Sequence, residues 1–516
     1  MSFSYPIPSE PSTLDPQVCS GMAAETAVAN LFEGLVRIGE NGAIVPGAAE
    51  KMDVSSDGLV YTFRLRSGLK WHLTGKFSDI LGEDFEKTFD AALAAKDFVF
   101  GFRRALSPST SSPGASSLYA IKNAKEVRNG ELPATSLGVA AADTHTLIIT
   151  LSSKCADFLS LLTEPVSMPC NETFFNACKG KYGKGLSFTL CNGPFYLSKW
   201  TSGSSLLMKK NADYTGTNKA LPSSVTLYIN HDESSYTKKV SDGVYDAAIG
   251  VTAASIQADS AECNVFEFQN TVWGLCFNCG DDVLSNRYIR LALCGSFEAS
   301  KLGLADNHVR AKGLLPSCCR IGGENYREKA GSADFVAYNH EKASDYWRAG
   351  LDDLGLSSVT VTVMCTPENE YSVRKLLQYW QQSFGISIKA KADAVELSSL
   401  KKSLKDGKYQ VALAPVTVSS ASAAICLAEY SPESGKNIFS YASETYADII
   451  ANAFRSGSAA STAEGCRIAE SFLMQNGAFY PLYESSEFLT LAKGVSGIVG
   501  SPDGNSVCFA SAVKLN

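Results

Sequence analysis

The chain has 516 residues, of which 45% are hydrophobic and 19% charged, and its formal net charge at pH 7 is −7. This length predicts about three domain-sized units with sizeable cores. The net charge is negative and no stripe of basic residues is present, which argues against a nucleic-acid-binding protein. A polybasic patch of the kind that attaches proteins to membranes is also missing.

The chain lacks the segments that mark a membrane protein or an exported precursor. No run of about 18 apolar residues is present, which is the length needed to span a bilayer. The N-terminus, Met1–Pro6, has neither the basic nor the apolar region of a secretory signal. Two alternatives therefore remain: a cytosolic chain, or an exported chain whose signal is missing from this sequence.

The fifteen cysteines are scattered from Cys19 to Cys508 and do not form a dense framework. Their number is odd, and the adjacent Cys318 and Cys319 are not expected to bridge each other. We interpret most of them as small buried hydrophobic residues, with a few disulfides as the alternative. The single Cys-x-x-Cys, Cys276–Cys279, ends a strand-like run and has no second pair for zinc, so we interpret it as structural.

Strand-like and helix-like stretches alternate along the chain. Period-two alternation of apolar residues predicts strands, and apolar spacings of three and four predict helices. In chain order, we expect a strand at 60–66, a helix at 96–106, strands at 146–151 and 359–364, and a helix at 371–384 that ends at Gly385. This mixture predicts an α/β or α+β fold.

Local motifs for catalysis, metal binding and cofactor binding are missing from the sequence. Each of the five histidines stands alone, and no Gly-x-Ser-x-Gly elbow is present. The segment Gly180–Gly185 has the outer glycines of a phosphate-binding loop, but it lacks the lysine and is interpreted as an ordinary loop. We therefore expect no cofactor and no metal, and we place a peptidase with dispersed catalytic groups last among the alternatives.

Short segments that follow one another through nearly the whole chain carry a resemblance to a known family. They include Phe32-Glu-Gly-Leu35 and the helix that begins at Lys96-Asp97. The full ordered set is Ser9–Pro16, Asn30–Arg37, Ser56–Arg66, Leu69–Trp71, Lys96–Pro108, Leu137–Val139, Asp143–Leu147, Asn192–Leu197, Tyr245–Asp246, Arg290–Leu293, Gly313–Pro316 and Trp380–Ile386. Together they resemble the family 5 extracellular solute-binding proteins, the peptide and oligopeptide receptors of ABC importers.

The resemblance implies an α/β fold of the two-lobed periplasmic-binding-protein type, with mixed sheets flanked by helices and an additional domain. It places lobe 1 at 1–44, 165–270 and 485–516, the additional domain at 45–164, and lobe 2 at 271–484. The two crossings between the lobes are expected near Thr271 and Glu484.

The resemblance also implies what the protein does. It would capture oligopeptides in a cleft between the lobes by hinge closure and deliver them to the permease subunits of an ABC transporter, without catalysis. We expect a monomer outside the cytoplasm, either periplasmic or lipid-anchored at the cell surface. The alternative is the same fold with a non-peptide solute: an oligosaccharide, an opine or a metal chelate.

Positions that match the family's cleft give the candidate ligand-binding residues. They are Glu33, Tyr119, Trp273, Asn278, Ser419 and Tyr483. For Glu33, a helix cap or a buried ion pair is an equally weighted alternative. For Trp273 and Tyr483, packing at the hinge is the alternative.

The sequence departs from the family pattern in two places. Many peptide-binding relatives have an aspartate that pairs with the peptide's amino group, and here Ser419 stands at that position. A buried ammonium without a carboxylate is unfavourable, so either another acid substitutes or the ligand lacks a free N-terminal amine there. The possible substitutes are Asp393, Glu429 and Glu433, with plain surface charges as an equally weighted alternative. The second departure is an insertion after Trp71, which we expect at the surface.

Overall fold

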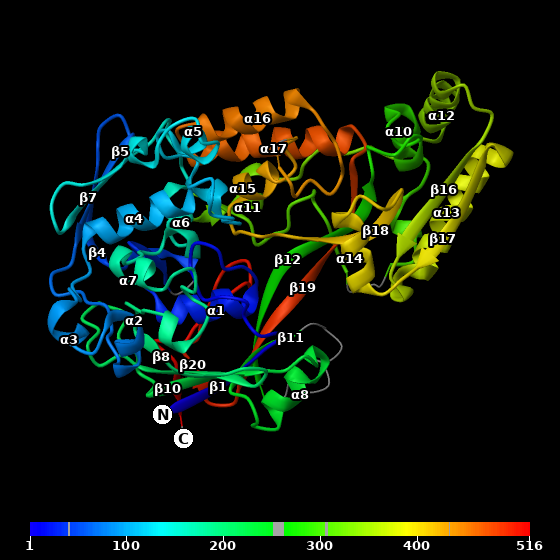
Figure 1. Ribbon diagram of the computed structural model, residues 1–516. Helices are drawn as coiled ribbons and strands as arrows, with labels where there is room; N and C mark the ends of the chain where they lie inside the picture. Colours follow the sequence, from blue (N-terminus) through cyan, green and yellow to red (C-terminus); the bar gives the residue numbers. More distant parts are fainter. Residues whose placement is uncertain (40–41, 251–262, 305–307, 433, 516) are drawn as a thin grey trace. The chain divides into compact units, whose positions relative to one another are not determined.

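The computed structural model describes residues 1–39, 42–250, 263–304, 308–432 and 434–515 (Figure 1). The chain forms two compact units, unit 1 (Met1–Phe268 and Ser486–Asn516) and unit 2 (Gln269–Ser485). It passes between them twice, within the strands β12 (Cys263–Phe277) and β19 (Phe479–Ala492). The predicted three-part division, with an additional domain at 45–164, stays a prediction. None of the helices in the described ranges has the length and apolarity needed to cross a membrane.

One sheet of unit 1 has the strand order β1-β10-β9-β8. Strand β1 (Ser2–Ile7) pairs in parallel with β10 (Ser224–Ile229), and β9 (Ser205–Lys210) and β8 (Phe195–Thr201) continue the sheet antiparallel. Alternate side chains of a strand point to the same face, and in β1 the alternate residues Phe3, Tyr5 and Ile7 are buried. Helix α1 (Met22–Leu31) contacts β8, which places the residues after its C-terminus beside this sheet.

The other four-stranded sheet of unit 1 is antiparallel, with the order β4-β5-β7-β6. Its strands are β4 (Ala49–Val54), β5 (Val60–Leu65), β7 (Thr146–Thr150) and β6 (Val139–Ala141). Helix α4 (Ala95–Ala105) packs against β6 and β7. In its first turn, one oxygen of Asp97 accepts hydrogen bonds from the Ala94 N–H at 3.0 Å and from the Trp71 indole at 3.2 Å. The strands predicted at 60–66 and 146–151 and the helix predicted at 96–106 are confirmed.

The insertion after Trp71 folds into short helices against the rest of unit 1. Its buried Phe77 packs edge-on against Phe174 of another helix, with 4.9 Å between the ring centroids. The elements of the insertion are η2 (Gly75–Phe77), α2 (Ser78–Leu81) and α3 (Phe85–Thr88).

The remaining elements of unit 1 are short. Its helices are η3 (Ala115–Leu118), α5 (Ala124–Arg128), η4 (Ala134–Ser136), α6 (Phe158–Leu161), η5 (Pro165–Ser167), α7 (Glu172–Ala177), η6 (Leu186–Phe188), η7 (Glu233–Ser235) and α8 (Tyr236–Ser241). Its strands are β2 (Val36–Ile38), β3 (Ile44–Pro46), β11 (Ala247–Gly250), β20 (Val495–Ser496), β21 (Val499–Gly500), β22 (Val507–Cys508) and β23 (Val513–Lys514).

Unit 2 is a sheet between two layers of helices. Its strands follow the order β19-β12-β18-β16-β17, with β13 (Val309–Arg310) paired to β19. The part of β19 that lies in unit 1 pairs with β11. The pairing is parallel among β16 (Val359–Cys365), β17 (Ile388–Ala394) and β18 (Val411–Thr417), and antiparallel between β12 and β18. The architecture is therefore mixed α/β, as predicted.

The two faces of this sheet bury alternate residues of the same strands. Leu275 and Phe277 of β12 join one core, whereas Cys276, between them, joins the other. The first core is closed by α10 (Arg287–Gly295), α12 (His340–Leu354) and α13 (Glu370–Phe384). The second is closed by α11 (Tyr326–Ala330), α14 (Leu397–Lys405), α15 (Ala423–Ala428), α16 (Glu444–Arg455) and α17 (Ala459–Gln475). The short elements are η9 (Ala299–Lys301), β14 (Arg320–Ile321), β15 (Glu324–Asn325), η10 (Pro367–Asn369) and η11 (Gly385–Ser387).

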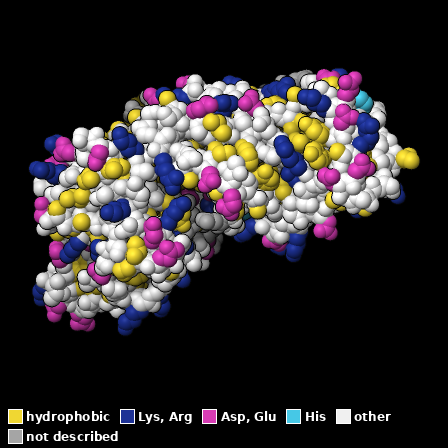
Figure 2. All heavy atoms as spheres, turned by 90° about the horizontal axis from the view of Figure 1, so that it is seen from above, with side chains coloured by type: hydrophobic (Ala, Val, Ile, Leu, Met, Phe, Trp, Pro, Cys, Tyr) yellow, Lys and Arg dark blue, Asp and Glu magenta, His cyan; other side chains and the backbone are white. Residues whose placement is uncertain are grey.

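The strand predicted at 359–364 and the helix predicted at 371–384 correspond to β16 and α13. The helix ends where predicted, because Gly385 has a φ of 57°, which glycine adopts far more readily than other residues. On the face shown in Figure 2, basic and acidic side chains are interspersed and neither sign forms a continuous field.

Candidate functional site

Glu33 lies two residues after the end of α1. Its backbone is held by Asn192, which comes shortly before strand β8. The Asn192 side chain accepts a hydrogen bond from the Glu33 N–H at 3.2 Å and donates one to the Glu33 carbonyl at 2.9 Å. Gly193 allows this close approach, because a Cβ at that position would lie 2.7 Å from the carbonyl carbon of Leu31. Two segments that carried the resemblance, 30–37 and 192–197, therefore fit together here.

The Glu33 carboxylate is buried and only half satisfied. The side chain is 4% exposed, and its Oε1 accepts a short hydrogen bond from the Tyr214 hydroxyl. Its Oε2 has no hydrogen-bond partner among the described residues. Burial raises the pKa of Glu33 to about 7, although the Tyr214 hydrogen bond and the charges of Arg37 and Arg66 lower it. The two alternatives expected for Glu33 are a helix cap and a buried ion pair. Among the described residues, its carboxylate forms neither.

A small hollow of about 70 Å³ opens beside Glu33. Close by, a Cβ at Gly216 would clash with the Tyr214 hydroxyl and lie 2.8 Å from Glu33 Oε2, so only glycine fits beside this pair. The hollow is lined by Ala29, Phe32, Glu33, Gly34, Arg37, Ile38, Thr163, Met168, Asn218, Val499, Ser501, Ser506 and Cys508. This space holds a few water molecules or one small group of a ligand, but not a whole peptide.

Tyr119, the other candidate in unit 1, is half-buried after the 3₁₀ helix η3. The Lys125 ammonium lies 5.7 Å from the centroid of its ring, a cation–π arrangement. Within the described residues, no hydrogen bond or ring contact joins Tyr119 to Glu33.

In unit 2, Trp273 of β12 and Tyr483 of β19 lie together in an aromatic stack. Their ring centroids are 5.9 Å apart and their planes differ by 9°. The imidazole of His308 also stacks on Tyr483, with centroids 3.9 Å apart and 6° between the planes. The Tyr483 hydroxyl donates to Asn369 at 3.4 Å, and burial raises the pKa of Tyr483 to about 12.

His308 was missed by the sequence reasoning. It comes just before β13, whose Arg310 pairs with Tyr483, and this pairing brings the imidazole over the tyrosine ring. Burial lowers the pKa of His308, and its Nδ1 has no hydrogen-bond partner within the described ranges. A lone histidine in the sequence gives no signal for such a stack.

Asn278 and Ser419 lie at opposite ends of the β12–β18 pair and have different surroundings. The Asn278 amide donates to the carbonyls of Gly407 at 3.1 Å and Tyr409 at 2.9 Å, and its oxygen accepts from the Gly280 N–H at 3.1 Å. Its side chain therefore holds three backbone groups in place. Ser419 is exposed, two residues beyond the end of β18.

One of the three proposed substitute acids lies directly beside Ser419. The Ser419 hydroxyl donates to Glu429 Oε1 at 2.7 Å, and Glu429 also pairs with the Lys436 ammonium at 2.5 Å. Asp393 is exposed on β17, and Glu433 lies outside the described residues. Of the two substitute acids that lie in the described ranges, Glu429 contacts Ser419, whereas Asp393 lies on a different strand.

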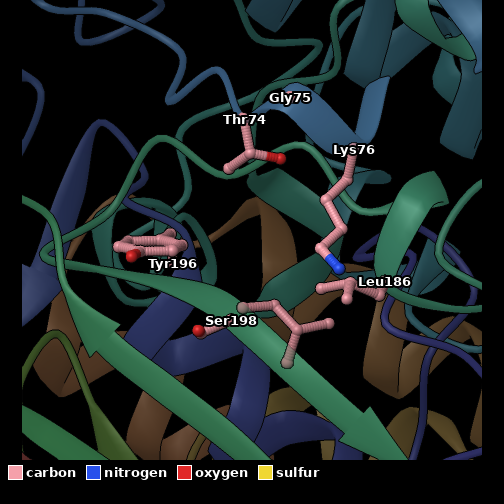
Figure 3. Close-up of a pocket in the computed structure, with 7 residues that line it drawn as sticks. Thr74, Gly75, Lys76, Leu186, Tyr196 and Ser198 are labelled. Atoms are coloured by element: carbon pink, nitrogen blue, oxygen red, sulfur yellow. The ribbon is translucent and has the colours of Figure 1, made fainter. Parts of the chain in front are cut away.

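A separate hollow, of about 480 Å³, lies where the insertion meets β8 (Figure 3). It is lined by Thr74, Gly75, Lys76, Leu186, Tyr196, Leu197 and Ser198. The Lys76 side chain extends across it towards Leu186 (Figure 3). None of the predicted ligand-binding residues lines this hollow, which is shallow and open on the surface of unit 1.

Comparison with known proteins identifies several relatives. The dipeptide-binding protein DppE of Bacillus subtilis (strain 168) is 24% identical over 503 residues, which cover 96% of this chain and 89% of that protein. The probable deoxycholate-binding periplasmic protein YgiS of Escherichia coli (strain K12) is 35% identical over 214 residues, 41% of this chain and 37% of that one.

Solved structures share the fold across the full length. The substrate-binding domain of an oligopeptide ABC transporter from Bacillus anthracis matches with a TM-score of 0.77 and 23% identity, covering 100% of this chain and 99% of that one. Haemophilus influenzae OppA in complex with the peptide RPPGFSPFR matches with a TM-score of 0.78 and 20% identity, over 100% and 99% of the two chains. The model of the bacterial extracellular solute-binding proteins, family 5, matches residues 43–437, and the chain therefore belongs to this family.

Proposed function

We propose that this protein is the substrate-binding component of an ABC importer and that its solutes are oligopeptides. The observation that carries the proposal is the family match over residues 43–437, together with a dipeptide-binding relative that aligns with 96% of the chain. In this role the protein closes its two lobes on the solute, releases it unchanged to the permease, and catalyses no reaction.

The proposed contacts follow from the groups that unit 1 and unit 2 leave available. The unpartnered Oε2 of Glu33 accepts a hydrogen bond from a donor group of the peptide, and the hollow beside it takes one small side chain. The stacked rings of Trp273, Tyr483 and His308 offer an aromatic surface for apolar parts of the peptide.

A free amino group of the peptide has Glu429 as its proposed partner. This carboxylate lies beside Ser419 and is shared with Lys436, so an incoming ammonium must compete with the lysine. We therefore expect a weaker preference for a free N-terminus than an unshared aspartate would give. Replacing Lys436 with glutamine is expected to strengthen binding of free-amine peptides relative to their N-acetylated forms.

The test is native mass spectrometry of the freshly purified protein, followed by calorimetry with a library of two- to five-residue peptides. We expect retained peptide mass or measurable heat, and recovery of every bound peptide without cleavage. If no peptide in the library binds, the peptide assignment is wrong. If a peptide is hydrolysed, and the hydrolysis disappears in a single Ser or Cys variant, the protein is an enzyme.

A bile-acid-like amphiphilic acid is the second candidate solute. It is favoured by the 214-residue match, at 35% identity, to the probable deoxycholate-binding protein. Calorimetry with deoxycholate decides between the two candidate solutes. Heat with deoxycholate and none with peptides would make the bile-acid-like solute the first candidate.

We also propose that the protein acts outside the cytoplasm, in a periplasm or attached to the cell surface by a lipid. The family is one of extracellular solute-binding proteins, which supports this location. Fractionation of cells that express the full gene tests it, and recovery of the native protein only from the cytoplasm would contradict it.

A further inference from the structure

Three cysteines from two distant segments of unit 2 meet behind the Ser419 loop. Arg320 pairs with Ser422 in a parallel bridge, and its N–H donates to the Ala421 carbonyl at 2.7 Å. This pairing places Cys319, the residue before Arg320, against the first turn of α15. Cys426 lies in that turn, where its N–H donates to the Ser422 carbonyl at 3.1 Å.

The three thiols differ in their access to solvent. Cys319 is completely buried and Cys426 is 3% exposed, both in the core beneath α15. Cys318 is half-buried and packs against the same core. The Cys319 thiol lies within side-chain hydrogen-bonding reach of both Cys318 and Cys426. One accessible thiol therefore stands next to two shielded thiols that are in reach of one another.

We propose that this cluster is a thiol-oxidation site, in which Cys319 and Cys426 become a disulfide when a small-molecule disulfide reaches Cys318. Extracytoplasmic compartments are oxidising and supply such disulfides. The product joins two segments that are already paired through their backbones at Arg320 and Ser422. Its formation therefore needs local side-chain movement and no change of fold.

The reaction proceeds by three exchanges. The Cys318 thiolate attacks the small disulfide RSSR, a Cys318–SR bond forms, and the first RS⁻ leaves and takes up the proton that Cys318 lost. Cys319 then attacks the Cys318 sulfur and releases the second RS⁻, which is protonated by the proton from Cys319. Finally Cys426 attacks Cys319, which forms the Cys319–Cys426 bond and returns the Cys426 proton to Cys318. In sum, two protein thiols are oxidised and RSSR is reduced to two RSH.

The relay through Cys318 explains why the buried pair needs the accessible thiol. The neighbouring thiols Cys318 and Cys426, together with burial, raise the pKa of Cys319, so little of it is thiolate and direct attack on an external disulfide is slow. The bond between adjacent residues 318 and 319 is strained, so the third exchange is downhill. Once formed, the bridge ties α15 to the segment at Cys319 and restrains the loop with Ser419. Two parts of the proposal rest on the proposed function: the supply of disulfides outside the cytoplasm and this last effect, on solute binding.

The experiment uses the full chain, reduced and then incubated with oxidised glutathione, and follows disulfides by non-reducing tryptic mapping. We expect a mass loss of about 2 Da and a link between the peptides Gly313–Arg320 and Tyr409–Lys436. In C318S, where the first peptide retains only Cys319, the same link is expected to form at least tenfold more slowly. C319S and C426S are expected to form no link between these peptides.

The matched control is C294S, which removes a buried thiol from the other core of unit 2 and leaves the link unchanged. A wild-type map that shows only a glutathione adduct on Cys318 would overturn the proposal. So would a link that persists in C319S, or one that forms equally fast in C318S. The wild-type map needs neither a variant that folds nor a bound solute, so its failure is distinct from the failure of the peptide assignment. Where peptides bind, oxidation is expected to change their affinity at least threefold in wild type and not in C426S.

Discussion

Two buried glutamates, one in each unit, show how differently the same side chain can be used. Glu470 of α17 is completely buried and receives four hydrogen bonds: one from the Leu315 N–H, one from the Tyr326 hydroxyl and two from the Arg327 guanidinium. Glu33 is almost as buried but receives one, from Tyr214. A saturated buried carboxylate has no acceptor capacity left for a ligand, whereas Glu33 keeps one oxygen for it. Glu470 therefore has a structural role, and Glu33 is a candidate for ligand recognition.

The largest effect is expected from breaking the saturated cluster. Replacing Glu470 with alanine leaves the Arg327 guanidinium buried without its carboxylate, which destabilises the fold by about 3–5 kcal/mol. Urea unfolding at pH 7 measures the change in the free energy of unfolding. The control is Glu464→Ala on the same helix, whose side chain is 54% exposed in its pair with the partly exposed Arg467, and it is expected to lose less than about 1 kcal/mol. Equal losses in the two variants would show that the buried Glu470 cluster contributes no more to the free energy of unfolding than the Glu464–Arg467 pair does.

The second effect, of at most about 3 kcal/mol, is in the pH dependence of stability. The pKa of Glu33 is raised from 4.5 to about 7, so between these values the folded state keeps a proton that the unfolded state has lost. Stability from this group is present at low pH and is lost as the pH rises through that window. Glu33→Gln cannot titrate, so the stability of wild type relative to this variant is expected to fall from pH 4.5 to 7 and then level off. Thermal or urea unfolding at five pH values measures the difference, and a flat difference would place the pKa of Glu33 near its ordinary value.

The third effect is on ligand affinity and separates the two glutamates most directly. At pH 8 the Glu33→Gln variant is expected to bind peptides at least about tenfold more weakly, because a charge-assisted hydrogen bond contributes about 1.5–3 kcal/mol. At pH 6, where Glu33 is largely protonated in wild type, the difference between wild type and variant is expected to shrink. Calorimetry with one bound peptide at both pH values provides the measurement. Unchanged affinity at both would remove Glu33 from the binding site.

The elements of this fold could be predicted from local sequence, but the partners at the candidate site could not. The strands at β5, β7 and β16 and the helices α4 and α13 follow from the spacing of apolar residues, which is a local property. The pair Glu33–Tyr214 spans 181 residues, and His308 meets Tyr483 only because β13 pairs with β19. The resemblance singled out Glu33 and Tyr483 by position. The free carboxylate oxygen and the third ring depend on tertiary packing, for which the sequence contains no local signal.

The smallest effect tests whether the single partner of Glu33 sets its charge. The Tyr214 hydrogen bond favours the ionised carboxylate, so Tyr214→Phe is expected to raise the pKa of Glu33 above about 7. The midpoint of the pH-dependent stability change would then move to higher pH, while stability at pH 8 falls by about 1 kcal/mol. The control is Tyr228→Phe, an exposed tyrosine of β10, which is expected to change neither quantity. A midpoint that stays in place would mean that burial and the two nearby arginines set the charge of Glu33 by themselves. Glu33 would then differ from Glu470 in its surroundings as a whole, and not through the number of its hydrogen-bond donors.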